Sequence, residues 1–189
     1  MSQTLPLHTG HRVTLHEWQT DWSQRDERYE LVDGTPTVSP TEHPDNLWAA
    51  LQLSRTLLDM LEPRGDWRCF LGAALQLTSE PNLGIRHPDA TLLRPGASRT
   101  NPLGVQGVEL VAEVLSPGRR HIDLRDKRHE YAGAGIPRYL ILDRHAPQRR
   151  LTLLTDPVAG DYRSSVTGEH ITVTIDGHDI PVTATRLLD

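Results

Sequence analysis

The sequence predicts a single α/β domain, and three features of the chain lead to that prediction. Residues 108–115 (VELVAEVL) form an almost continuous apolar run, which is typical of a central strand covered on both faces. Residues 122–134 have helical spacing and are followed by an apolar strand over 138–143. Strand, helix and strand in this order indicate a βαβ unit with a parallel strand pair. A chain of 189 residues fits one compact domain, and we therefore expect one active site.

The N-terminal third of the chain predicts two helices separated by a β-hairpin. Residues 14–23 begin with a threonine suited to cap a short helix, in which apolar residues recur at helical spacing. Residues 29–39 carry an Asp-Gly dipeptide between two short β-like runs, which is the commonest signal of a hairpin. A long helix is predicted over 45–61 from an apolar stripe that begins with Leu47 and Leu51.

Short strands and loops fill the remainder of the chain. Strands are predicted at 67–71, 74–78 and 89–93, and turn-forming residues follow the second of them. Residues 94–104 are rich in Pro, Gly and Ser and predict an exposed loop. Residues 149–189 contain three further β-like runs (RLTLLTD, YRSSVT and HITVTID) before a final short turn. The predicted domain therefore ends in additional strands.

Composition indicates a globular protein of the cytoplasm. Charged residues make up 24% and hydrophobic residues 37% of the chain, which is ordinary for a folded domain. No apolar run approaches the ~20 residues that span a bilayer, and the first residues lack the apolar stretch of a signal peptide. The single cysteine, Cys69, agrees with a reducing compartment. A net charge of −5 excludes a global positive field, so any binding of nucleic acid must be local or metal-assisted.

Glu113 is a carboxylate inside the apolar strand predicted over 108–115. Burying an unpaired carboxylate there would cost several kcal/mol, so something must compensate its charge. A metal ion, an arginine or a raised pKa would each do so. The sequence leaves these three alternatives open.

Lys127 is the only lysine of the protein, and the other nineteen basic residues are arginines. Its spacing from Leu124 and Tyr131 places the three residues on one stripe of the predicted helix, facing inward. Because a βαβ helix packs back over its sheet, this stripe should pass close to Glu113. The alternative is a solvated ion pair with Asp123, four residues earlier.

Asp89 begins a second strand directly after a proline. Together with Glu113, it supplies two hard oxygen ligands, to which the carbonyl of Val114 adds a third. Lys127 adds a cation that would position water and stabilise the transition state of phosphodiester hydrolysis. These residues form the set that a Mg²⁺-dependent or Mn²⁺-dependent phosphodiesterase needs.

Several motifs then identify a resemblance that covers residues 29–143. YELVDG, HPDATLL, EVLSP, DLRDK and HEYAGAGIP occur in this order, and the stretch from EVLSP onward is the most specific. The chain thus resembles the Uma-two family of restriction-endonuclease-like proteins, within the PD-(D/E)XK nuclease superfamily. The resemblance implies a mixed β-sheet flanked by helices, in one domain with a core at about 26–145 and appended strands at 146–189. It also implies that the metal ligands are Asp89 and Glu113.

One departure from the superfamily pattern concerns the lysine. The position two residues after Glu113 is Leu115 and not lysine, so Lys127 on the next helix replaces it. Glu30 matches an acidic position of the family, and it is either a further ligand or an ordinary hairpin acid. Tyr131 either forms a hydrogen bond in the site or only packs.

Two functions follow from these observations. The first is a metal-dependent endonuclease that hydrolyses DNA, and a homodimer is compatible with this fold. The second is a non-catalytic module that binds nucleic acid or protein on the same fold, with its acids paired to arginines. A basic cluster that includes Arg119, Arg120, Arg125 and Arg128 either follows a phosphate backbone or is a solvated face.

Overall fold

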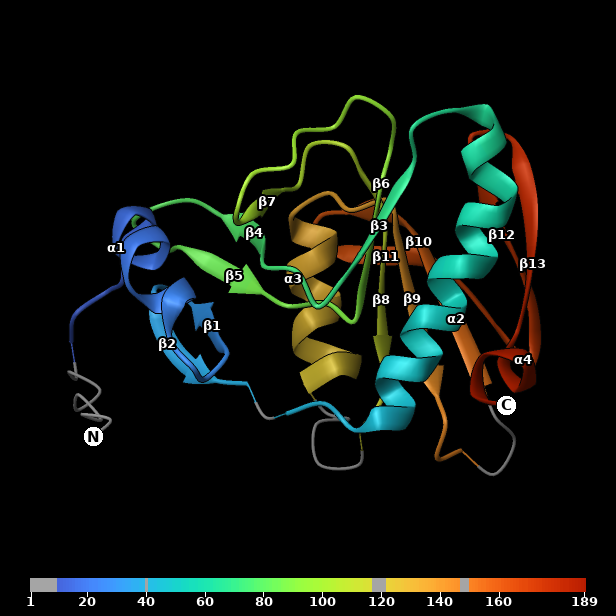
Figure 1. Ribbon diagram of the computed structural model, residues 1–189, viewed down its shortest axis with the longest axis horizontal. Helices are drawn as coiled ribbons and strands as arrows, with labels where there is room; N and C mark the ends of the chain where they lie inside the picture. Colours follow the sequence, from blue (N-terminus) through green and yellow to red (C-terminus); the bar gives the residue numbers. More distant parts are fainter. Residues whose placement is uncertain (1–9, 40, 117–121, 147–149) are drawn as a thin grey trace.

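The computed structural model describes residues 10–39, 41–116, 122–146 and 150–189, and their strands form two sheets and a two-stranded ribbon (Figure 1). The main sheet has the order β11 (Asp161–Gly168), β10 (Arg150–Val158), β9 (Arg138–Asp143), β8 (Val108–Val114), β6 (Ala90–Leu93) and β3 (Arg68–Leu71). The second sheet has the order β2 (Thr35–Val38), β1 (Tyr29–Val32), β5 (Gly84–Arg86), β4 (Leu75–Thr78) and β7 (Leu103–Gly104). The ribbon pairs β12 (His170–Ile175) with β13 (His178–Thr183).

The main sheet is mixed. Strands β8 and β9 run parallel, with Glu113 opposite Ile141, whereas the other neighbours in this sheet are antiparallel. A crossover between β8 and β9 carries one turn of π-helix (Ile122–Asp126) and helix α3 (Lys127–Gly133). The predicted βαβ unit and mixed α/β fold are therefore confirmed, together with the additional C-terminal strands.

Helices cover both faces of the main sheet (Figure 1). Helix α2 (Pro44–Leu61), helix α4 (Ala184–Leu188) and the β12–β13 ribbon share one apolar core with Ala112 and Val114 of β8. Helix α3 shares the other core with Val111 and Leu115. Side chains alternate between the faces of a strand, so Glu113 points to the face that α3 covers.

Helix α2 begins where the His43 ring accepts a hydrogen bond from the Asp45 amide. Its buried side agrees with the predicted stripe only in part, because Leu57 and Leu61 are buried whereas Leu47 and Leu51 are exposed. Ala49 and Leu53 face the sheet instead, since a small side chain lets the helix backbone approach the strands closely. None of the helices in the described part of the chain combines the length and the apolar character needed to cross a membrane.

Three other local predictions were wrong or incomplete. The predicted helix 122–134 is divided by the π-turn, which changes the helical phase and leaves Leu124 38% exposed. Strand β5 was not predicted, because a turn was expected up to its first residue. Strand β13 and helix α4 were also missed. The short first helix predicted at 14–23 is confirmed as α1 (Leu15–Thr20), with Thr14 as its cap, and a separate 3-10 turn (Trp22–Gln24) follows it.

Candidate active site

Glu113 lies near the carboxyl end of β8 and is 4% exposed. Its Oε1 atom accepts hydrogen bonds from Lys127 Nζ at 2.8 Å and from Tyr131 Oη at 2.7 Å. Lys127 and Tyr131 are four residues apart, so one face of α3 presents both donors. The prediction that the sole lysine faces inward toward Glu113 is confirmed.

Lys127 is 3% exposed, so a solvated ion pair on the outside of α3 is excluded. The side chain of Asp123, its alternative partner, lies outside the described residues. Tyr131 is fully buried. Its burial is the main reason why its pKa lies well above the ordinary value, and the negative charge of Glu113 is the second reason. Tyr131 therefore stays protonated and acts as a hydrogen-bond donor to the carboxylate, which answers the question left open by the sequence.

Asp89 reaches the same end of β8 from the neighbouring strand. It immediately precedes β6, and its Oδ2 atom accepts a 2.6 Å hydrogen bond from the Val114 amide. The pairing of β6 with β8 ends at Ala90 and Ala112. Just beyond this point, the Asp89 side chain accepts the hydrogen bond that a main-chain carbonyl would accept in a continuing strand pair. This contact places the Asp89 carboxylate beside the residue that follows Glu113.

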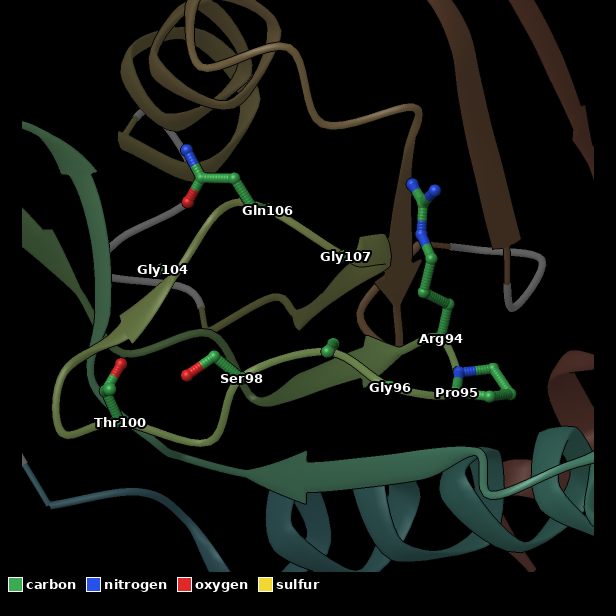
Figure 2. A pocket seen from close by; sticks show the side chains of 9 residues that line it. Arg94, Pro95, Gly96, Ser98, Thr100, Gly104, Gln106 and Gly107 are labelled. Carbon is green, nitrogen blue, oxygen red and sulfur yellow. The ribbon is translucent and has the colours of Figure 1, made fainter.

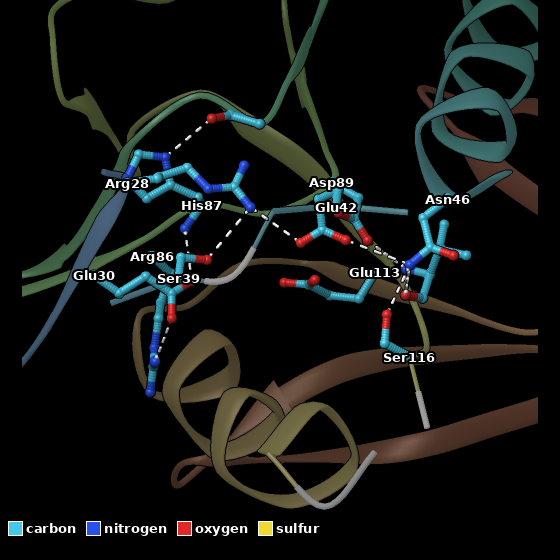
Figure 3. Close-up of polar contacts among 12 residues, drawn as sticks. Arg28, Glu30, Ser39, Glu42, Asn46, Arg86, His87, Asp89, Glu113 and Ser116 are labelled. Carbon is cyan, nitrogen blue, oxygen red and sulfur yellow. Dashed lines mark hydrogen bonds and ion pairs between the residues drawn. The ribbon is translucent and has the colours of Figure 1, made fainter. Parts of the chain in front are cut away.

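Asn46 is a buried residue of this region that sequence reasoning missed. Its Nδ2 atom donates to the Val114 carbonyl at 3.3 Å and to Ser116 Oγ at 2.9 Å (Figure 3). Its Oδ1 atom accepts from Arg144 at 3.0 Å, and the residue is only 1% exposed. A signal was present, because Asn46 precedes Ala49 and Leu53 on the buried stripe of α2. A polar residue on such a stripe must find buried partners.

Glu42 connects the hairpin to α2 across this region. Its two carboxylate oxygens bind Arg28 Nη2 at 3.0 Å and Asn46 Nδ2 at 3.4 Å, and Figure 3 shows the carboxylate between these two residues. Arg28 also donates to Ser39 at 3.4 Å. Hydrogen bonds from Arg28 to Glu42 and from Asn46 to Glu42 therefore hold the segment that precedes α2 in place.

Glu30 belongs to a second buried cluster. Its carboxylate binds Arg86 Nη1 at 2.9 Å and the His87 amide at 3.3 Å. Arg86 also holds Glu130 of α3 through two contacts of 2.6 Å. Burial alone would raise the pKa of Glu30, but the charges of Lys127 and Arg86 outweigh burial and lower it. Its contacts are thus with Arg86 and His87, and its role as a metal ligand stays a prediction.

His87 fixes the turn that leads to Asp89. Its ring nitrogens lie 3.0 Å from the carbonyl oxygens of Gly72 and Tyr29. The ring therefore connects the approach to β6 with the hairpin strand β1. This anchoring explains how a polar residue in the HPD sequence contributes to the position of the carboxylate that follows.

The oxygen donors gathered at the end of β8 are suited to a hard divalent cation. They are the carboxylates of Asp89 and Glu113 and the carbonyl of Val114, which are the ligand types preferred by Mg²⁺. Within the described ranges there is no group of three or more His, Cys, Asp or Glu side chains placed to hold a metal. Two carboxylate ligands are compatible with Mg²⁺, which keeps several of its waters when it binds to a protein.

The predicted basic cluster lies partly outside the described residues, which do not include Arg119 and Arg120. Arg125 is exposed. Arg128 binds Asp161 at 2.6 Å and the Tyr162 carbonyl at 3.3 Å, so it attaches α3 to β11.

Comparisons with known proteins identify the family and the fold of the chain. The family model Uma2, described as "Putative restriction endonuclease", matches residues 13–183. A crystal structure titled as a putative nuclease belonging to DUF820 from Anabaena variabilis has a TM-score of 0.64 at 11% identity, covering 87% of this chain and 91% of that one. At this identity the structural likeness shows the fold alone, and none of the curated proteins matches the chain. Because the family model spans most of the sequence, the chain belongs to the Uma2 family of restriction-endonuclease-like proteins.

Proposed function

We propose that this protein is a metal-dependent endonuclease that hydrolyses phosphodiester bonds of DNA. The observation that carries the proposal is the buried contact between Lys127 and Glu113, next to the Val114 amide that binds Asp89. Lys127 is the only lysine of the chain, and it is buried against a carboxylate at the end of a strand. Burying such an ion pair costs desolvation free energy, so stability alone does not explain it. Family membership supports a nuclease, while the DNA substrate and the metal are parts of this proposal.

The carboxylates of Asp89 and Glu113 and the carbonyl of Val114 would hold Mg²⁺ or Mn²⁺. When bound, the ion supplies Lewis acidity toward the phosphate and lowers the pKa of water. Asn46 donates to the Val114 carbonyl and thereby fixes its direction. The Asp89 contact with the Val114 amide fixes the other side of the same residue.

Lys127 would orient the attacking water and stabilise the negative charge that develops on the phosphate. A lysine ammonium is a compact point charge with three donors, and one of them binds Glu113. Tyr131 holds the same Glu113 oxygen and limits the rotation of the carboxylate. Preorganised donors of this kind are the largest single contribution in many active sites.

A non-catalytic binding module is the second candidate function, and one observation favours it. Lys127 and Tyr131 already compensate the charge of Glu113 without a metal. The net charge of −5 also argues against strong binding of nucleic acid by the whole surface. On this reading, the cluster would serve only the stability of the fold.

The deciding experiment is calorimetric titration of Mn²⁺ into wild type and Asp89→Ala, together with cleavage of plasmid DNA by wild type and Lys127→Ala. We expect metal binding to be lost in the aspartate variant and cleavage to be lost in the lysine variant. Asp59→Ala, which changes an exposed acid of α2, is the matched control and should leave both properties intact. Absence of metal binding at millimolar concentration, with no cleavage by wild type, would contradict the nuclease proposal and leave the binding module as the better account. Sedimentation of the same samples would test the expected homodimer.

A further inference from the structure

A groove of about 500 Å³ adjoins the candidate active site on the face of the main sheet that α3 covers. It contains apolar and hydroxyl side chains together with an arginine, the histidine His145 and the buried carboxylate of Asp143. Its principal lining residues are Leu115, Leu124, Ile141, Arg150, Thr152 and Thr167. A volume of this size is within the ~300–1,000 Å³ that pockets for small organic groups have.

The strand register shows where this groove lies relative to Glu113. Glu113 is opposite Ile141, Ile141 is opposite Thr152, and Thr152 is opposite Thr167. Residues that face each other across neighbouring strands project to the same side of the sheet, and adjacent strands are about 4.8 Å apart. The row therefore leads from the proposed metal ligand directly into the groove, which begins one strand away.

The other large groove of the protein has a different position. It has a volume of about 680 Å³ and is lined by residues 94–107 (Figure 2). Arg94 follows the end of β6 and Gly107 precedes the start of β8, whereas Asp89 and Glu113 lie at the opposite ends of these strands. This groove therefore does not adjoin the candidate site.

The chemistry of the groove beside Glu113 suits one nucleotide. Leu115, Leu124 and Ile141 supply apolar walls for a sugar and the face of a base. The hydroxyls of Thr152 and Thr167, 3.1 Å apart, can each donate or accept a hydrogen bond. Leu124 is exposed because of the π-turn, and this exposure gives the groove an apolar edge that a regular helix would bury.

Arg150 adds the charge that a nucleotide requires. It is exposed and lines the groove together with Asp143, which its Cα faces in the β9–β10 pair and whose Oδ1 atom accepts a hydrogen bond from the His145 amide. An arginine at the rim of an apolar groove can bind a phosphate with its planar fork of donors. With one nucleoside in the groove, the phosphate on one side of it would lie near Arg150. The phosphate on its other side would lie near the Lys127–Glu113 pair.

We propose that this groove binds the nucleotide adjacent to the phosphodiester that is cleaved, with Arg150 contacting the next phosphate of the same strand. The inference rests on the proposed nuclease function and assigns the substrate position to residues of β9, β10 and β11. Threonine hydroxyls pair with donors and acceptors alike, so the groove selects a nucleotide by shape and reads its base weakly.

The test measures binding of a fluorescein-labelled single-stranded DNA oligonucleotide in EDTA, and cleavage of the same oligonucleotide with Mn²⁺. Thr167→Trp should fill the groove and abolish binding and cleavage, because Thr167 is an exposed residue of its lining. Val166→Trp is the matched control, since Val166 is 58% exposed and projects from the other face of β11. Arg150→Gln should weaken binding. It should also reduce the slope of the logarithm of the binding constant against the logarithm of the salt concentration by about 1, as expected for one lost phosphate contact.

The outcomes separate this inference from the proposed function. Equal binding and cleavage by wild type, Thr167→Trp and Arg150→Gln would overturn the groove assignment and leave the nuclease proposal intact. Loss of both properties in Val166→Trp as well would also overturn the assignment, because the effect would not be specific to the groove. No binding and no cleavage by wild type would overturn both. Thermal unfolding of each variant checks its fold, and Arg150→Gln, which changes an exposed side chain, keeps the test valid if Thr167→Trp is destabilised.

Discussion

Two buried ionic clusters contact helix α3, and they differ in the kind of cation at their centre. Arg86 binds Glu30 and Glu130 with three nitrogen atoms, and two of its contacts form a planar fork with Glu130. Lys127 binds a single oxygen of Glu113, which it shares with Tyr131. One turn of the same helix therefore carries a rigid multidentate contact and a point-charge contact.

The difference indicates a division of labour between the clusters. Two carboxylates fix the orientation of the Arg86 guanidinium. The arginine cluster is therefore suited to hold β1, β5 and α3 in position relative to one another. Burial lowers and its carboxylate partners raise the pKa of Arg86, with a net increase that keeps it charged. A lysine ammonium can exchange one partner for another with little reorganisation, so the lysine cluster is suited to chemistry.

The largest effect is expected from Arg86→Met. Removing the arginine takes the guanidinium partner away from the buried carboxylate of Glu30, which should lower the free energy of unfolding by about 3–5 kcal/mol. Arg68→Met breaks the exposed pair with Asp66 and should cost less than about 1 kcal/mol. Urea denaturation measures both, and similar losses in the two variants would contradict the structural role of the arginine cluster.

Lys127→Met is expected to act mainly on chemistry. Loss of one preorganised donor should reduce the cleavage rate about 10²–10³-fold, as for other donors that stabilise transition-state charge. Lys127→Arg should not restore the rate, because a planar fork does not replace a point charge. The double variant Lys127→Met/Glu113→Gln should be more stable than Lys127→Met, since it removes a buried carboxylate that has lost its ammonium partner. A double variant that is less stable than Lys127→Met would show that the lysine does not compensate Glu113.

Tyr131→Phe is expected to have a smaller effect on stability. It removes a buried hydrogen bond to a charged acceptor, which contributes about 1.5–3 kcal/mol, whereas a bond to a neutral acceptor contributes about 0.5–1.5 kcal/mol. Tyr162→Phe is the matched control, because the Tyr162 hydroxyl donates to the neutral carbonyl of Ile136. If Tyr162→Phe destabilises the protein more in urea denaturation, the charge of Glu113 is not the cause of the difference.

The smallest effect is expected in the pH dependence of stability. The pKa of Glu30 is lowered in the folded protein, so its contribution is complete above the ordinary value of 4.5 and is lost as the pH falls through the lower folded pKa. The stability difference between wild type and Glu30→Gln should therefore shrink in acid, by at most about 1.4 kcal/mol per pH unit. A difference that grows as the pH falls would reverse the assigned sign.

The sequence predicted those parts of the fold that depend on local pattern. The apolar run of β8 and the strand β9 were predicted within one or two residues, because a buried strand has a composition that is visible in a short window. The buried side of α2 was predicted only in part, since Leu57 and Leu61 are buried as expected while Ala49 and Leu53 are buried where Leu47 and Leu51 were expected. A pattern of hydrophobicity does not show which face another element approaches.

The same distinction applies to the candidate site. Glu113 and Lys127 were identifiable from the sequence because one is an acid in an apolar strand and the other is the only lysine, fourteen residues later. Asn46 was not identifiable in this way, since its contacts with Val114 and Ser116 join residues 68 and 70 positions apart.

The sequence by itself thus determined the α/β class, the βαβ unit and the family, because these follow from residue patterns within short windows. Tertiary structure alone decided that the Asp89 carboxylate binds the Val114 amide and that Arg86 joins Glu30 to Glu130. It also decided that a π-turn exposes Leu124 beside a groove. The physical reason is that such contacts depend on strand register and helical phase, which are fixed only when distant segments pack together.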